Sequence, residues 1–172
     1  MIEKCEEEEK LSRLKREVII VAPHPDDEII GNFELLTNPD ISPIIIYTED
    51  VPNDRRQESM NLKKFVPNVK VQLFANHIPE NLLNPKTPLY FPDFVNEFHP
   101  DHVKIGNRGL ELFHKGLNVI FYSIQMNTKY IHTVKDFKGK RHLLEKVYPS
   151  QKDMWKFDHK YFLFEGRYQF LR

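Results

Sequence analysis

Two short clusters of polar residues have the composition and spacing to carry out chemistry in this sequence. Residues 24–28 read His-Pro-Asp-Asp-Glu and residues 99–102 read His-Pro-Asp-His, so the tripeptide His-Pro-Asp occurs twice. Together they supply three imidazoles and several carboxylates, a set of nitrogen and oxygen ligands suited to zinc. The alternative is that the acidic residues only cap a helix and complement its dipole. The histidine ahead of the acidic run and the second cluster favour a metal site.

The elements around these clusters follow a strand–helix–strand pattern. Uninterrupted apolar, β-branched runs predict buried strands, and the amphipathic segments between them predict helices. This alternation is typical of βαβ units, so we expect an α/β, Rossmann-like three-layer fold with a mostly parallel central sheet. Strands are expected at residues 18–22, 43–48, 69–74, 118–124 and 161–168, and helices at 29–36, 55–65, 103–114 and 139–148.

The position of both clusters within this pattern favours a shared site. The first cluster follows the strand at 18–22, and the second precedes the helix at 103–114. Parallel sheets bind ligands outside the carboxyl ends of their strands, where loops lead into helices. We therefore expect the two clusters to converge in space.

Length and composition limit the classes of protein. The 172 residues are expected to form a single domain, with residues 1–17 as a charged N-terminal leader that is either helical or frayed. Lys plus Arg and Asp plus Glu both number 25, and this balance disfavours nucleic acid as a partner. The lone Cys5 excludes an intrachain disulfide and fits a reducing compartment. Because no apolar run suits a signal core or a membrane span, we expect a cytoplasmic protein.

The two clusters resemble the motifs of the metal-dependent de-N-acetylases, the family of the N-acetylglucosaminyl-phosphatidylinositol deacetylase and the bacterial LmbE-like enzymes. Residues 23–28 match the first family motif, and residues 99–102 match the second. Weaker similarities are the Arg-Arg-x-Glu helix start at 55–58, the Ser-Gln pair at 150–151 and a final strand that contains Glu165. The resemblance covers roughly residues 18–168.

The resemblance implies a metal centre built from both clusters. His24, Asp27 and His102 would be the metal ligands, and Asp26 would be the general base. Spacing alone does not distinguish the roles of Asp26 and Asp27. Two imidazoles and one carboxylate leave open positions on zinc, as a catalytic site requires.

The resemblance also implies roles for residues around the ligands. His99 would stabilise the oxyanion or act as general acid, and Asp101 would orient His99 by a hydrogen bond. An arginine at the helix start would contact the substrate, and the sequence leaves Arg55 and Arg56 as alternatives.

The implied function is that of a zinc-dependent hydrolase, with ferrous iron as the alternative metal. It would remove the acetyl group from an N-acetylglucosamine-containing conjugate, so its partner would be a small-molecule or glycan amino sugar. Two alternatives stay open: a non-catalytic carbohydrate-binding or regulatory protein that keeps the fold, and a metal-dependent esterase or phosphoesterase. Pocket loops shorter than those of the family also allow a homo-oligomer in which a neighbouring subunit completes the site.

Several further residues are expected outside the metal site, in the core, on the surface or at the edge of the pocket. Tyr90 and Phe91 are expected on a loop that could line a sugar pocket. Lys140, Arg141 and Lys146 are expected on the surface. Histidines outside the two clusters are expected on the surface or as hydrogen-bonded core residues: His77, His114, His132, His142 and His159.

Overall fold

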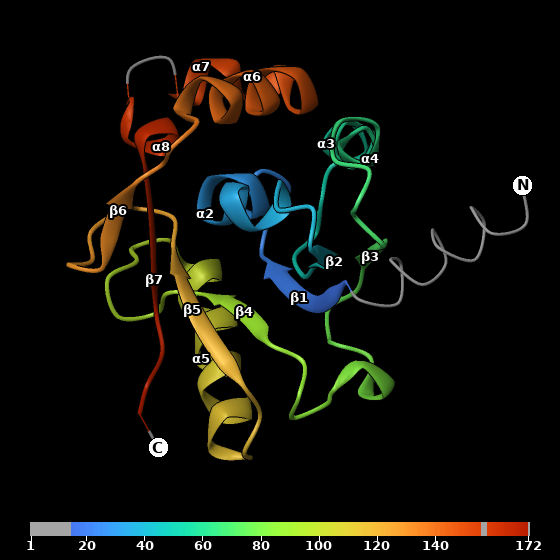
Figure 1. The fold of residues 1–172 in the computed structure, drawn as a ribbon, viewed down its shortest axis with the longest axis vertical. Helices are drawn as coiled ribbons and strands as arrows, with labels where there is room; N and C mark the ends of the chain where they lie inside the picture. The colour runs from blue at the N-terminus through green and yellow to red at the C-terminus, as the bar shows by residue number, and fades with distance from the viewer. Residues whose placement is uncertain (1–14, 156–157, 172) are drawn as a thin grey trace, which may run out of the picture.

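The computed structural model describes residues 15–155 and 158–171, which build a seven-stranded sheet in the order β3-β2-β1-β4-β5-β7-β6 (Figure 1). The first five strands in this order are parallel, and β7 runs antiparallel to both β5 and β6. The strands are β1 (Arg16–Ala22), β2 (Ile41–Tyr47), β3 (Val71–Phe74), β4 (Leu89–Pro92), β5 (Val119–Ser123), β6 (Ile131–Thr133) and β7 (Phe164–Tyr168).

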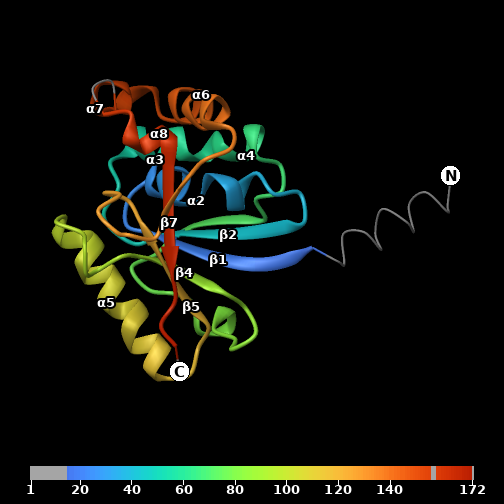
Figure 2. The same ribbon diagram turned by 60° about the vertical axis from the view of Figure 1, so that its left-hand side comes forward.

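Helices cover both faces of this sheet. The α-helices are α2 (Asp27–Leu36), α3 (Asn53–Met60), α4 (Leu62–Phe65), α5 (Pro100–His114), α6 (Phe137–Val147), α7 (Lys152–Trp155) and α8 (Lys160–Leu163), with short 3-10 helices η1 (Glu80–Leu82) and η2 (Pro149–Gln151). Figure 2 shows α2, α3 and α6 on one side of β1 and β2, and α5 on the other side. The predicted α/β, Rossmann-like three-layer fold with a mostly parallel sheet is confirmed.

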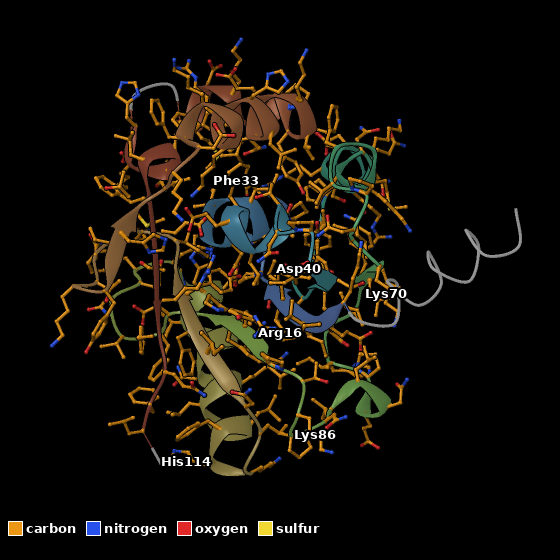
Figure 3. All side chains as sticks on the ribbon, in the orientation of Figure 1. Arg16, Phe33, Asp40, Lys70, Lys86 and His114 are labelled. Carbon is orange, nitrogen blue, oxygen red and sulfur yellow. The ribbon has the colours of Figure 1, made fainter. Side chains whose placement is uncertain are left out.

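The two cores of the protein lie on opposite faces of the sheet. Successive side chains of a strand point to opposite faces, so Val18 and Ile20 of β1 join the core beneath α2, whereas Ile19 and Val21 join the core beneath α5. Strands covered on both faces read as continuous apolar runs, which is why the sequence pattern identified β1 so clearly. At the amino ends of β1 and β2, the backbone N–H of Arg16 donates to the carbonyl of Asp40 (2.9 Å; both residues are labelled in Figure 3).

The strand predictions miss two members of the sheet. β4 lies in the centre, between β1 and β5, and it contains Tyr90 and Phe91. The placement of these two residues on a pocket loop is therefore wrong, because both side chains are buried in the sheet. β4 is only four residues long and ends in Pro92, so its sequence resembles a turn. β6 is a short, exposed edge strand without an apolar pattern.

Three other predictions need correction. The helix expected at 55–65 is broken at Asn61 into α3 and α4, and the strand expected at 161–168 begins as the helix α8 before β7. Residues 1–14 of the expected leader lie outside the described residues, and Arg16 and Glu17 belong to β1 rather than to a helix. The surface positions expected for Arg141, Lys146 and the five other histidines are confirmed.

Lys140 is fully buried, so its expected surface position was wrong. Its ammonium donates to the carbonyl oxygens of Ile30 (2.5 Å) and Phe164 (2.9 Å) and lies 3.4 Å from the Glu165 carboxylate. Burial lowers the pKa of Lys140 to about 8, although the charge of Glu165 opposes the shift. The side chain joins α6 to α2 and to the start of β7.

Two glycines bring α5 unusually close to the sheet. A Cβ atom on Gly109 would lie 2.6 Å from Cγ of Phe91, and one on Gly106 would lie 2.7 Å from the carbonyl oxygen of Pro92. No larger residue fits at either position without a shift of the helix. The contact fixes α5 against β4, and thereby fixes the amino end of α5, where the second polar cluster begins. None of the described helices is long and apolar enough to cross a membrane.

Candidate metal centre

The two polar clusters meet at the carboxyl ends of β1 and β4. From β1 the chain builds β2 and β3 on one side, and then crosses to the other side of β1 to form β4. Doubly wound sheets bind ligands in the crevice at such a reversal of strand order. The first cluster follows β1 directly, and the second begins α5. The ligand atoms of His24, His99 and His102 lie within 4.8 Å of one another.

Asp27 lies between two of these imidazoles. Its Oδ2 is 3.4 Å from Nδ1 of His24 and 3.4 Å from Nε2 of His102, and it also accepts a hydrogen bond from the backbone N–H of His24 (2.9 Å). Zinc bonds of ~2.0–2.1 Å place tetrahedral ligand atoms about 3.4 Å apart. Both separations between Asp27 and the histidine nitrogens therefore fit ligand atoms of one tetrahedral zinc ion.

A carboxylate contacts the outer nitrogen of each of these two histidines. Nε2 of His24 lies 3.0 Å from Asp101, and Nδ1 of His102 lies 3.2 Å from Glu97. Histidine ligands of metals commonly donate their second N–H to a carboxylate, which fixes the tautomer and orients the ring. In this arrangement the remaining nitrogen of each ring faces Asp27.

Asp101 does not make the contact that the resemblance implied. Its carboxylate binds His24, whereas Nδ1 of His99 is 3.8 Å from it and instead accepts a hydrogen bond from the backbone N–H of Asp101 (3.3 Å). His99 thus acts as the N-cap of α5. The neutral tautomer that accepts at Nδ1 carries its proton on Nε2.

Glu97 is a site residue that the sequence analysis missed. Its side chain is fully buried; one oxygen accepts from the backbone N–H groups of Ile124 (2.8 Å) and Gln125 (2.9 Å), and the other contacts His102. The residue therefore joins the end of β5 to the metal centre. A carboxylate two residues before the second cluster was the available signal.

Asp26 adopts a strained backbone conformation beside the ligands. Its φ of 115° lies in the region that favours glycine, and non-glycine residues held there often mark functional sites. The backbone N–H of Asp26 donates to the buried Glu28 carboxylate (2.9 Å). One carboxylate oxygen of Asp26 lies 3.1 Å from the guanidinium of Arg55, which also donates to the carbonyl of Pro25.

The structure distinguishes the two arginines at the start of α3. Arg55 reaches the site through Asp26, whereas Arg56 is exposed and its guanidinium packs over the ring of Phe74 at 4.4 Å. Two segments that carry the weaker family similarities, residues 55–58 and 150–151, contact each other away from the candidate metal centre. The carboxylate of Glu58 accepts hydrogen bonds from the N–H (2.9 Å) and the hydroxyl (2.6 Å) of Ser150.

Burial and mutual charge shift the pKa values of the acidic and basic groups. Burial raises the pKa of Asp26 well above its usual range, the neighbouring Asp27 carboxylate adds to this, and Arg55 opposes it. Burial would raise the pKa of Asp27 as well, but the positive charges of His102 and His24 outweigh it and lower the pKa. Burial opposes the charged form of His102, yet Asp27 and Glu97 raise its pKa to about 10. A charged Asp27 carboxylate beside a protonated His102 is therefore the favoured arrangement of these groups.

The clusters open into a pocket of about 200 Å³. His99, whose side chain is 46% exposed, lies at its rim, whereas Asp27 and His102 are buried. Besides the polar clusters, the lining includes Met154 and Trp155 of α7 and Tyr161 of α8. The described lining residues are His24, Asp26, Asp27, Ile30, Arg55, His99, His102, Ile124, Gln125, Met154, Trp155 and Tyr161.

A second group of potential ligands has another explanation. Atoms of Glu34, His132 and Glu165 also lie within 4.8 Å of one another. Glu165 is neutralised by Lys140 (3.4 Å) and by Arg167 (2.6 Å), so this group is an ion-pair network between α2, β6 and β7. The Glu165 of the weaker family similarity therefore has a structural role.

Comparisons with known proteins leave the function open. No protein-family model matches this chain, and no curated protein matches it either. Among solved structures the chain is similar to "The structure of PKMT2 from Rickettsia typhi", with a TM-score of 0.39 and 12% sequence identity. The similarity covers 81% of this chain and 25% of that chain, so this chain spans about a quarter of the length of that structure.

Proposed function

We propose that this chain is a zinc-dependent hydrolase that removes the acetyl group from an N-acetylated amino sugar, such as an N-acetylglucosamine conjugate. The observation that carries the proposal is the position of Asp27 Oδ2, 3.4 Å from ring nitrogens of both His24 and His102, with Asp26 in the same pocket. The choice of an amino-sugar substrate rests on the resemblance of residues 23–28 and 99–102 to the de-N-acetylase motifs. Ferrous iron is the alternative metal for the same ligands.

The ligands would be His24, Asp27 and His102. Bound there, zinc would lower the pKa of a water molecule to about 7 and polarise the amide carbonyl. Asp101 and Glu97 support the two rings from behind, so that the nitrogens facing Asp27 keep their lone pairs for the metal.

Asp26 is the residue that would take the proton of the attacking water. A carboxyl group with a raised pKa is a stronger base than an ordinary aspartate, and proton transfer by a positioned group contributes ~10²–10⁴-fold to a rate. Arg55 holds the carboxylate in place and, as a cation, favours its ionised form. The rigid backbone at Asp26 limits the directions in which the carboxylate can point.

His99 would stabilise the oxyanion by donating a hydrogen bond. Its Nδ1 accepts from the backbone of Asp101, which leaves the proton on Nε2. Burial and the positive charges of His102 and His24 lower the pKa of His99, so the ring is neutral at pH 7. A fixed donor aimed at developing negative charge is worth about 3 kcal/mol of transition-state stabilisation.

The test compares Asp26→Asn and His102→Ala with the unmodified chain. Metal content is measured by elemental analysis, and release of free amine is measured with a panel of N-acetylglucosamine conjugates. We expect about one zinc per chain in the unmodified protein and in Asp26→Asn, with turnover in Asp26→Asn lower by at least ~100-fold. His102→Ala should lose the metal, because a ligand is missing.

Two results would contradict the proposal. Near-normal turnover in Asp26→Asn would exclude Asp26 as the base, and failure of the unmodified protein to bind either zinc or ferrous iron would exclude the metal centre. His114→Ala, which changes an exposed histidine at the far end of α5 (Figure 3), is the control and should retain both metal and turnover. The expected cytoplasmic location is tested separately by fractionating cells that produce the chain.

A further inference from the structure

A second pocket lies on the face of the sheet that α5 covers. Its volume is about 420 Å³, within the ~300–1,000 Å³ of typical small-molecule sites. It is formed between α5 and the segment that follows β3, both of which lie below the sheet in Figure 2. Its floor is buried and apolar, made by Val21 of β1, Phe91 of β4 and Ile105 of α5.

One end of this pocket is polar. The N–H of Ala75 donates to the carbonyl of Tyr47 (2.9 Å), which brings the next residues, Thr48 and Asn76, together beyond the carboxyl ends of β2 and β3. Asn76 in turn accepts a hydrogen bond from Arg108 of α5 through its carbonyl oxygen (2.7 Å). Thr48, Asn76 and Arg108 therefore lie at the same end of the pocket.

Two of these groups have unused hydrogen-bonding capacity. Thr48 is 7% exposed, and its hydroxyl has no partner within residues 15–155 and 158–171. Arg108 is exposed, makes one hydrogen bond with a guanidinium that carries five donors, and forms no ion pair with any described carboxylate. Buried polar groups are normally paired, so the unpaired Thr48 hydroxyl indicates a missing hydrogen-bond partner, and Arg108 lines the same pocket.

The other end of the pocket is apolar. Leu112 lies one turn beyond Arg108 on α5, and Ile78 and Leu83 of the segment after β3 line the pocket as well. All three are partly buried or packed against the core beneath α5. The pocket thus has a polar end at the edge of the sheet and an apolar end along α5.

We propose that this pocket binds a small amphipathic carboxylate, an aliphatic acid of roughly six to ten carbons. The carboxylate accepts hydrogen bonds from Arg108 and Thr48, and the aliphatic chain lies against Ile78, Leu83 and Leu112. A guanidinium matches a carboxylate in both charge and geometry. The exposed Glu111, also in the lining, works against the charge of the ligand.

The test measures binding of octanoate by calorimetry to the full chain after treatment with EDTA. Removing metal first excludes coordination of the carboxylate by a bound metal ion, and the Arg108→Gln variant distinguishes this pocket from the metal-free centre. We expect octanoate to bind, octanol to bind on the order of tenfold more weakly, and Arg108→Gln to weaken octanoate by a similar factor. Thr48→Val should also weaken octanoate, and Glu111→Gln should strengthen it.

Two further variants distinguish binding in this pocket from nonspecific effects of charge or apolar surface. Lys115→Gln removes an exposed positive charge at the C-cap of α5, outside the pocket lining, and should leave octanoate binding unchanged. Leu83→Trp should block the apolar end. Four results would each overturn the proposal. They are equal binding of octanol and octanoate, an equal loss in Lys115→Gln, unaltered binding in both Arg108→Gln and Leu83→Trp, and no binding at all.

Discussion

Single carboxylates decide how well the proposed metal centre can work. Glu97 is the clearest case, because one of its oxygens is occupied by two backbone N–H groups and the other is directed at His102. The hydrogen bonds from the backbone fix the orientation of the Glu97 carboxylate, and this carboxylate in turn orients the His102 ring. The orientation of His102 therefore depends on a residue that would never touch the metal.

Glu97→Gln should weaken zinc binding by roughly 10–100-fold, the usual effect of losing a carboxylate behind a histidine ligand. The glutamine can keep the backbone contacts through its carbonyl oxygen, but its NH₂ group would face Nδ1 of His102 and favour the wrong tautomer. The measurement is competition for zinc against a chromophoric chelator. Glu145→Gln, at an exposed ion pair with Arg141, is the matched control. Equal zinc affinities of the two variants would argue against an orienting role.

Zinc binding should release protons, because the metal-free centre holds them. The pKa of His102 is raised to about 10 and that of His24 is also raised. His102 is therefore protonated at pH 7 and must lose its proton to become a ligand. Each released proton makes zinc affinity rise up to about tenfold per pH unit. The stability of the metal-free fold depends on pH in the opposite direction from zinc affinity. The stabilisation that protonated His102 gives to the fold is complete below pH ~6.5 and is lost as pH rises towards 10.

Calorimetry at pH 7 in two buffers of different ionisation enthalpy gives the number of protons directly. At least about one proton per zinc is expected in the unmodified chain. A buffer-independent binding enthalpy would mean that the histidines are already neutral.

At this scale the sequence identified the clusters but not their contacts. Residue types and the repeated His-Pro-Asp pointed to the two clusters, and the family resemblance was needed to assign His24, Asp27 and His102 as ligands. The choice between Arg55 and Arg56 depends on the rotation of the first turn of α3, and the partner of Asp101 depends on side-chain directions across two elements. Neither can be derived from spacing along the chain.

At the scale of elements, the packing of α5 on β4 positions the second cluster. Gly106 and Gly109 allow the helix to approach Phe91 and Pro92, and His99 and His102 project from its amino end. A change in the distance between α5 and the sheet would change the distance between the two polar clusters.

Gly109→Ala should destabilise the protein by about 1–3 kcal/mol, because the added methyl group overlaps Phe91. This loss is expected even though alanine favours helix by about 1 kcal/mol over glycine. Denaturant unfolding measures the change, and weaker zinc binding should accompany it. Asn107→Ala on the exposed face of α5 is the control, with a change within about 0.5 kcal/mol. A stabilised Gly109→Ala would show that α5 can move away at no cost.

The elements that the sequence predicted are those with a strong pattern. β1, β2, β5 and α5 have long apolar or amphipathic runs, and their predictions hold to within a few residues. Lys140 was misplaced although a signal existed, since it lies three, four and seven residues before the buried Leu143, Leu144 and Val147 of the same helix face. A lysine on an apolar face is buried only when carbonyls and a carboxylate receive it, and those come from distant elements.

For the whole molecule, metal and fold should stabilise each other. A ligand that binds only the folded state adds stability that grows with its concentration, about 2.7 kcal/mol at 100-fold above Kd. The candidate ligands come from two segments that only the folded sheet brings together, so the unfolded chain has no comparable site.

Zinc at that excess should raise the Tm of the metal-free protein by about 5–10 °C. The measurement is a thermal unfolding scan after EDTA treatment, with and without added zinc. His102→Ala should show little of this shift, whereas the exposed-histidine control His114→Ala should show all of it. A shift of equal size in His102→Ala would place the zinc elsewhere on the molecule.

The order of the strands in the sheet could not be predicted from the sequence. The pattern predicted parallel strands and helices on both faces, but nothing in it gave β4 a place beside β1. That pairing joins Ile19 to Leu89 and Ile20 to Tyr90, and it depends on the crossover between them as a whole.

This pairing also sets a time order for assembly. Ile19 and Leu89 are 70 residues apart along the chain (89 minus 19), and β2 and β3 are built from the residues between them. Contacts between such distant residues form late, because the intervening loop must close first. Zinc cannot nucleate folding from a site that does not exist until β4 has docked. The metal should therefore leave the folding rate nearly unchanged and lower the unfolding rate. The zinc-bound protein would then stay folded for longer because it unfolds more slowly.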